Sequence, residues 1–255
     1  MSRGLKQLGY GVLYLAVIAA IGFGVYVRYV RQAPSCFDHI QNQGEQGIDC
    51  GPVCGNICMD ALRPIEVGNA PSPMFFENAP GRATVLALLV NPNADFGATK
   101  VSYEFSFYDA SHTLVASVPT ETFIYPGERR YVALVNAAIP VVADSMGVTI
   151  ATNTAWAASS SMGLPPNLVF ENQTVSSVAS GTVMVNATLA NQENFSFSNI
   201  AVVAIFHAPS GAVVGVSNTV VDRVDAAGSV PVSLSYPTNV PIDASATELY
   251  AYAPR

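Results

Sequence analysis

Residues 100–109 read KVSYEFSFYD. Every second residue from Val101 to Phe107 is apolar, and the residues between them are Ser, Glu and Ser. This period of two is typical of an antiparallel β-strand that buries one face and exposes the other. The turn-forming residues 109–112 come next, and a second apolar run starts at Leu114. We therefore predict a β-hairpin in this segment.

The same pattern recurs 99 residues later in the chain. An alignment of the chain with itself at this offset runs without a gap over about 30 residues. The paired residues are Val90 with Leu189, Phe96 with Phe195, Val101 with Ile200, Tyr103 with Val202, Phe107 with Phe206, and Ser111 with Ser210. His112 pairs with Gly211, at a turn position that favours a positive φ, so we expect His112 to be a turn residue rather than a ligand. The duplication predicts two domains of one fold, each of about 95 residues.

The composition agrees with a β-rich, turn-rich chain. Only 11% of the residues are charged, against about 25% in a typical soluble domain. We predict an all-β fold class: two tandem immunoglobulin-like antiparallel β-sandwiches that follow one N-terminal transmembrane α-helix and a small disulfide-rich module. The sandwiches are expected over residues 63–156 and 168–255. Residues 157–167, AASSSMGLPPN, are predicted to be a short, semi-rigid linker.

Residues 8–27 read LGYGVLYLAVIAAIGFGVYV and carry no charge. A helix of this length spans about 30 Å, the thickness of the hydrocarbon core of a bilayer. We predict a transmembrane helix over residues 8–30, with residues 1–7 as a cytoplasmic tail. A cleaved signal peptide is the alternative, but its apolar region would be shorter, and Arg28 and Arg31 occupy the expected cleavage zone.

Small side chains recur every four residues along this helix, at Ala16, Ala20 and Gly24. Such a stripe lets two helix backbones approach closely in a bilayer. It therefore raises the hypothesis of a helix–helix contact and a homodimer. The alternative is chance, because Ala and Gly are common in membrane helices.

The orientation of the helix does not follow from its flanking charges, since basic residues lie on both sides of it. Beyond residue 31 the chain has all 18 of its acidic side chains and seven of its 11 basic ones, a net charge of −11. Long domains cross membranes largely regardless of charge, so cysteine usage has to decide the orientation.

Four cysteines lie within 23 residues, at Cys36, Cys50, Cys54 and Cys58, and the rest of the chain has none. An even number of clustered cysteines in a short, loop-rich segment predicts two disulfides, with all three pairings open. Zinc is the rival interpretation, but structural zinc sites usually contain C-x₂-C knuckles, which this spacing lacks. Disulfides place the module, residues 34–59, in an oxidising compartment. We therefore expect the C-terminal domains outside the cytoplasm, anchored in the cell membrane.

Within the module, residues 36–54 read CFDHIQNQGEQGIDCGPVC. This segment resembles the motif C-x-D-G-I-x-N-x-x-E-x-x-x-D-C-G-G of many surface proteins, with His39 and Pro52 where the motif has Gly. Four of its side chains carry oxygen ligands that a calcium ion accepts: Asp38, Asn42, Glu45 and Asp49. The alternative is that these polar side chains cap their own backbone turns.

A second resemblance covers residues 91–130, NPNADFGATKVSYEFSFYDASHTLVASVPTETFIYPGERR. The order of Asn-rich turn, amphipathic strand, Tyr-Asp, hairpin and Pro-Gly-Glu is similar to the FxLYD and LEA-type group of immunoglobulin-like β-sandwiches. The matching residues are Asn91, Tyr108, Asp109, Pro126, Gly127 and Glu128. The complete arrangement also resembles uncharacterised bacterial envelope proteins, which implies an architecture and no established activity.

The sequence holds no recognisable catalytic constellation. Its three histidines, His39, His112 and His207, are far apart in the chain and have no Ser-His-Asp pattern around them. The negative charge disfavours nucleic-acid binding, and Arg129-Arg130 is interpreted as a solvated strand end. We expect a non-catalytic envelope protein, without a cofactor apart from the calcium considered above, that contacts protein or glycan. The alternative is a structural subunit of a self-associating surface assembly.

Overall fold

The computed structural model describes residues 3–30, 35–55, 57–58, 62–69, 73–178, 181–238 and 240–255. Arg31 and the ends of the predicted tail and cysteine module, at residues 1–2, 34 and 59, lie outside these ranges. The chain divides into two compact units, residues 1–60 and residues 61–255. The second unit contains both sandwiches.

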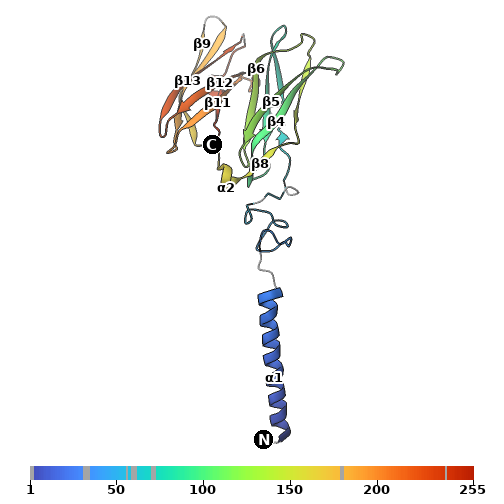
Figure 1. The fold of residues 1–255 in the computed structure, drawn as a ribbon. Coiled ribbons are helices and arrows are strands. Elements are labelled where there is room, and N and C mark those ends of the chain that lie inside the picture. Colours follow the sequence, from blue (N-terminus) through green and yellow to red (C-terminus); the bar gives the residue numbers. More distant parts are fainter. Residues whose placement is uncertain are drawn as a thin grey trace. The chain divides into compact units, whose positions relative to one another are not determined.

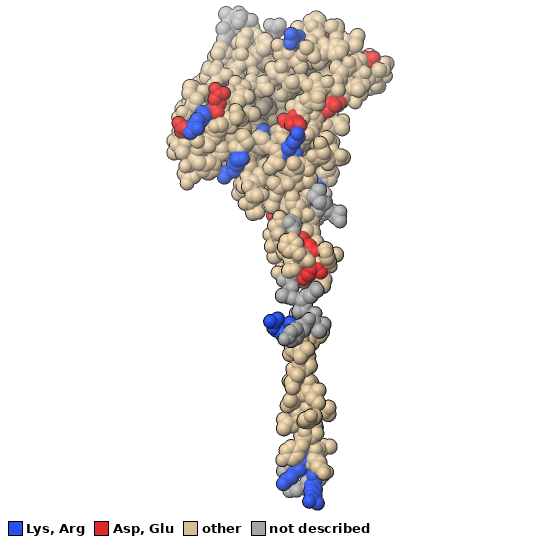
Figure 2. Space-filling view, in the orientation of Figure 1, with Lys and Arg blue, Asp and Glu red and all other residues tan. Residues whose placement is uncertain are grey.

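The first unit begins with α1 (Arg3–Val25), which continues as a π-helical turn over Tyr26–Val30. The segment Lys6–Arg28 has a mean hydropathy of 2.1, and none of it is buried by the rest of the protein. Figure 2 shows no charged side chain along the helix between the basic residues near its two ends. The helix is long and apolar enough to cross a membrane, a property that signal sequences share.

The second unit consists of antiparallel strands in four sheets (Figure 1). One sheet contains β1 (Glu66–Val67), β2 (Met74–Ala79), β3 (Arg82–Val90) and β6 (Arg129–Ala138). The next contains β4 (Phe96–Tyr108), β5 (Leu114–Ile124), β7 (Ser145–Ile150) and β8 (Ala155–Ala158). The third contains β9 (Leu168–Val178), β10 (Thr182–Asn191) and β13 (Ser229–Pro237). The fourth contains β11 (Phe197–His207), β12 (Val213–Val224) and β14 (Glu248–Tyr252). Two short helical segments, α2 (Ser159–Met162) and a 3₁₀ turn (Ala244–Ala246), complete the unit.

The four sheets form two β-sandwiches, as the alternating sequence predicts. The alternating apolar residues of β4, from Val101 to Phe107, are all buried in the core of the first sandwich. Ile200, Val202, Ala204 and Phe206 of β11 fill the core of the second sandwich in the same way. The all-β fold class is therefore confirmed.

The predicted hairpins are present in both repeats. The His112 N–H donates to the carbonyl of Asp109 (2.9 Å), and the Gly211 N–H donates to the carbonyl of Ala208 (2.8 Å). His112 has a φ of 59° and Gly211 a φ of 84°, so the histidine occupies a left-handed turn position as predicted.

The structure corrects the ungapped alignment at one end. Asn91 donates through Nδ2 to the carbonyls of Phe96 and Tyr125, and Asn191 donates to those of Phe195 and Asp225. The two asparagines are thus equivalent at an offset of 100, while the β4 and β11 strands that follow keep the offset of 99. Consequently Leu189 corresponds to Leu89 and not to Val90. The two residues also face equivalent partners across their sheets, Arg130 and Val230.

The two sandwiches pack together through the outer faces of two sheets. Fully or largely buried residues at this contact come from β3, β11, β12 and β14: Leu86, Val203, Ile205, Val216 and Tyr252. Half-buried side chains from β2, β5 and β6 surround them, including Phe76, Phe123 and Tyr131. The strands β3 and β11 are therefore covered on both faces, and the sheets follow one another as four layers (Figure 1).

Equivalent positions in the two repeats differ wherever only one of them lies at this contact. Leu86 of β3 is fully buried, whereas its counterpart Asn186 of β10 is exposed to solvent. Val203 of β11 is also buried, and its counterpart in β4 is the half-buried Glu104. The duplication therefore preserved the inner faces of the sandwiches, while the outer faces diverged according to which one is covered.

The segment predicted to be a short, semi-rigid linker, residues 157–167, is partly built into the first sandwich. Its first two residues end β8, which pairs with β4, and the next four form α2. The Ser159 N–H also donates to the carbonyl of Asp95 (2.8 Å). Residues 163–167 alone connect this part to β9.

We expect Leu86→Asn to lower the free energy of unfolding by about 3–5 kcal/mol, because it removes a buried leucine and buries an amide. The matched control is Asn186→Leu, which changes an exposed residue at the equivalent position and should alter stability by less than about 0.5 kcal/mol. Chemical denaturation of the purified protein in detergent measures both values. Similar losses for the two variants would show that the two outer faces do not differ as described.

Candidate functional sites in the cysteine module and between the sandwiches

Two disulfides staple the cysteine module. Cys36 is bonded to Cys54 and Cys50 to Cys58, with Cα–Cα distances of 5.4 and 5.1 Å. The first cysteine thus pairs with the third and the second with the fourth, so the two closed loops overlap along the chain. Since the cysteines are all oxidised, no thiolate is left for the zinc site that was the rival interpretation.

Glu45 is the most enclosed acidic side chain of the module, at 6% exposure. Its Oε2 accepts from the N–H groups of Asn42 (3.2 Å) and Asp49 (3.3 Å). Its Oε1 lies 3.0 Å from the Cys54 sulfur, but a disulfide sulfur carries no proton, so this is a contact rather than a hydrogen bond. The carboxylate therefore organises the loop that closes around the disulfides.

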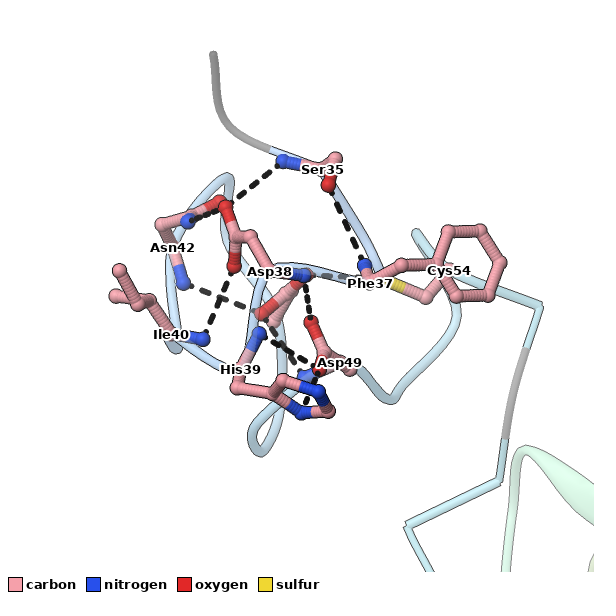
Figure 3. Close-up of polar contacts among 9 residues, drawn as sticks. Ser35, Phe37, Asp38, His39, Ile40, Asn42, Asp49 and Cys54 are labelled. Carbon is pink, nitrogen blue, oxygen red and sulfur yellow. Dashed lines mark hydrogen bonds and ion pairs between the residues drawn. The ribbon is translucent and has the colours of Figure 1, made fainter. Parts of the chain in front are cut away.

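Asp38 and Asp49 also accept hydrogen bonds from backbone N–H groups (Figure 3). Asp38 accepts from the N–H groups of Ser35 (3.1 Å) and Ile40 (3.0 Å) and from Nδ2 of Asn42 (2.9 Å). Asp49 accepts from the N–H groups of Asp38 (3.0 Å) and His39 (2.9 Å).

His39 itself has a φ of 59°. Glycine adopts this left-handed conformation more readily than histidine does.

These contacts favour the capping interpretation of the four predicted calcium ligands. The oxygens of Asp38, Glu45 and Asp49 do not gather within 4.8 Å of one another, and each carboxylate already accepts backbone N–H groups. Asn42 Oδ1 is enclosed without a hydrogen-bond partner among the described residues. One such oxygen is far fewer than the six to eight that calcium takes, so calcium binding stays a hypothesis.

The predicted helix–helix residues Ala16, Ala20 and Gly24 lie along α1 at intervals of four residues and are exposed. A Cβ added at Gly24 would meet nothing within 4 Å. The face is therefore open to a second helix or to lipid, and the homodimer stays a prediction.

A buried arginine lies at the contact between the two sandwiches. Arg130, on β6, is 4% exposed, so the interpretation of Arg129-Arg130 as a solvated strand end is wrong for its second residue. Arg130 lies opposite Leu89 and therefore points to the inner face of its sheet, whereas Arg129 is exposed. The sequence could not separate the two, since they are identical neighbours at the start of one strand.

The Arg130 guanidinium is covered by two aromatic rings. Its Cζ lies 3.9 Å from the centroid of the Phe123 ring and 4.3 Å from that of the Tyr252 ring. Attraction between the cation and the two ring faces stabilises this placement. Tyr252 comes from the second sandwich, so one of the two rings over Arg130 is present only while the two sandwiches are in contact.

The guanidinium has only weak polar partners. Nη1 lies 4.0 Å from Oε1 of Glu128, and neither Nε nor Nη1 makes a hydrogen bond. Burial lowers the pKa of Arg130 and raises that of Glu128. Burial also raises the pKa of the neighbouring Tyr103 to about 12. The two charged groups thus share an enclosed site without the close pairing that usually accompanies burial.

Tyrosines also make hydrogen bonds between the two sandwiches near this arginine. The Tyr125 hydroxyl donates to the carbonyl of Ala253 (2.9 Å), and the Tyr131 N–H donates to the hydroxyl of Tyr252 (2.9 Å). The Tyr131 ring also lies 4.8 Å from that of Tyr250.

No motif in the sequence points to this site. The signal that could have revealed it is the unbroken apolar character of residues 85–90 and 201–206, which is typical of strands covered on both faces.

Comparisons with known proteins add little to this description. No family model matches the chain, and no curated protein matches it. Among solved structures it is similar to red sea bream transglutaminase, with 9% identity over 75% of this chain and a TM-score of 0.23. The match spans 31% of that enzyme. So distant a likeness supports no inference about activity, and the resemblance to FxLYD and LEA-type domains stays a prediction.

The disulfide pairing can be tested by mass spectrometry. The unreduced protein should be lighter than the reduced protein by four hydrogens, about 4 Da, because each disulfide removes two. Peptide mapping after cleavage between the cysteines should link Cys36 with Cys54 and Cys50 with Cys58. Free thiols, or links between any other pair, would contradict the arrangement described.

The carboxyl of Asp38 should titrate below its ordinary pKa of 3.8, because the hydrogen bond from Asn42 and those from backbone N–H groups favour its ionised form. The contribution of these bonds to stability is therefore present above the ordinary pKa and is lost as the pH falls through the lowered value. A carboxyl ¹³C NMR titration measures the midpoint. Asn42→Ala should raise it, whereas Asn153→Ala, in an exposed loop, should leave it unchanged. Equal midpoints in the parent and in Asn42→Ala would contradict the role given to Asn42.

Proposed function

We propose that this chain is a membrane-anchored, extracytoplasmic protein of the cell envelope that displays two fused β-sandwiches as a non-catalytic binding or scaffold unit. The observation that carries the proposal is the combination of α1 with the disulfide module that follows it. The helix exposes apolar side chains along its whole length, and lipid is the solvent that suits such a surface.

The disulfides support the proposed side of the membrane. Structural disulfides persist in oxidising compartments and are rare in the cytosol. The module begins a few residues beyond the helix, so the module and the sandwiches would share the side opposite to the N-terminus. Residues 1–7 would then be cytoplasmic.

The surface of the sandwiches supports a role in contact rather than in catalysis. Figure 2 shows only scattered charged side chains on the visible face of the sandwiches. The outer face of β4 and β5 carries an open groove of about 540 Å³ lined largely by Ser, Thr, Pro and Glu side chains. Such an open groove, lined by hydroxyl and carboxylate side chains together with apolar atoms, suits contact with protein or glycan. Self-association into a structural assembly is the second candidate, favoured by the open small-residue face of α1.

The topology can be tested by adding an epitope tag after Arg255 and treating intact cells with protease. We expect loss of the C-terminal tag, because the domain that carries it would lie outside the cytoplasmic membrane. A tag placed before Met1 is the matched control and should survive until the membrane is opened. In a bacterium with an outer membrane, that membrane is first made permeable. Protection of the C-terminal tag together with loss of the N-terminal one would reverse the topology and refute the proposal.

A further inference from the structure

We propose that the cleft beside Arg130 is a binding site for a small carboxylate with an apolar or aromatic body. This inference goes beyond the proposed envelope role and does not depend on which side of a membrane the sandwiches occupy. The cleft has a volume of about 260 Å³ and is lined by residues of both sandwiches. This volume would hold a molecule the size of benzoic acid or about nine waters, at about 30 Å³ per water.

The chemistry of Arg130 defines what the cleft can bind. A guanidinium offers five N–H donors and no acceptor, yet Nε and Nη1 have no hydrogen-bond partner. Enclosed donors without a partner cost free energy, and the carboxylate of Glu128 lies 4.0 Å from Nη1, so the cation is only partly compensated and attracts a negative ligand. The Arg130 guanidinium therefore lacks a close negative charge and acceptor oxygens.

The two rings determine the direction from which a ligand approaches. Phe123 and Tyr252 cover the guanidinium, with their centroids 3.9 and 4.3 Å from Cζ. The two rings occupy part of the space around the guanidinium, so a ligand can approach only where they leave it open. A carboxylate suits this site because it brings a negative charge together with an oxygen that can accept from the guanidinium. Since Nε and Nη1 are enclosed, a ligand in the cleft would have to meet the guanidinium at Nη2.

Groups of the second sandwich and of β5 complete the cleft. Asn218 and Thr122 line it and offer an amide and a hydroxyl to a ligand, while Val203 and the aromatic rings provide an apolar wall. Negative side chains compete only weakly. Glu121 lies at the rim but is 60% exposed and binds Lys100 at 2.6 Å.

Glu128 also competes only weakly for the guanidinium. It stays 4.0 Å from Nη1 and accepts from the Tyr125 N–H at 2.7 Å through its other oxygen. A carboxylate ligand would therefore meet a cation that is only partly neutralised.

The test uses the full-length protein in detergent, with sodium benzoate as the probe and benzamide as its neutral counterpart. Calorimetric titration should give saturable binding of benzoate and at least tenfold weaker binding of benzamide. Arg130→Met, which keeps an unbranched side chain of similar length without the charge, should weaken benzoate binding at least tenfold. The matched control is Arg129→Gln, which removes the exposed neighbour and should leave the affinity unchanged.

A second measurement protects the test against a variant that does not fold. In the parent protein with ¹⁵N-labelled arginine, benzoate should shift one Nε–H resonance, and Asn218→Ala should weaken the binding while that resonance stays in place. The proposal is overturned if benzoate does not bind, if benzamide binds equally well, if folded Arg130→Met binds like the parent, or if no arginine resonance shifts. Absence of benzoate binding would mean that only water fills the cleft, and it would leave the topology experiment unaffected.

Discussion

The contact between the outer faces of two sheets is the constraint on which the second unit depends. It covers β3 and β11 on both faces and makes four layers of sheet into one compact unit. The hydrophobic effect drives this packing, because Leu86 and Val203 would otherwise expose apolar surface that their counterparts Asn186 and Glu104 do not have. A duplicated domain thus became an asymmetric pair through substitutions on two outer faces, while the inner faces kept their pattern.

The same contact creates the environment of Arg130. A cation taken out of water is costly unless its surroundings compensate, and here the compensation comes from two rings and a distant carboxylate. The ring of Tyr252 comes from the other sandwich, and its hydroxyl also accepts the Tyr131 N–H. The arginine, the rings and the docking of the sandwiches are therefore energetically coupled. Separating the sandwiches would expose the cation and leave a backbone N–H without its partner.

The first unit is stabilised differently from the second. Its helix has no apolar partner among the described residues, so it needs lipid, and its module is too small to build a hydrophobic core. Two disulfides whose loops overlap along the chain stabilise the module. Carboxylates take the place of a core by accepting hydrogen bonds from backbone N–H groups of the turns. The residues that resemble calcium ligands in the sequence thus have a structural role that needs no ion. Spacing alone could not separate the two interpretations, because both require oxygen atoms at the same turns.

The sequence by itself determined the apolar helix, the existence of two disulfides, the two sandwiches and the turn at His112, since each depends on a local pattern: an uncharged run, clustered cysteines, a period of two, a hairpin. It did not determine the disulfide pairing, the one-residue shift that aligns Asn91 with Asn191, or the burial of Arg130. Those features arise where segments distant in the chain meet, at a crossed pair of disulfides and at a contact between two sheets. Only the tertiary structure decided them, because a residue's own neighbours in the chain do not encode which distant segments will pack around it.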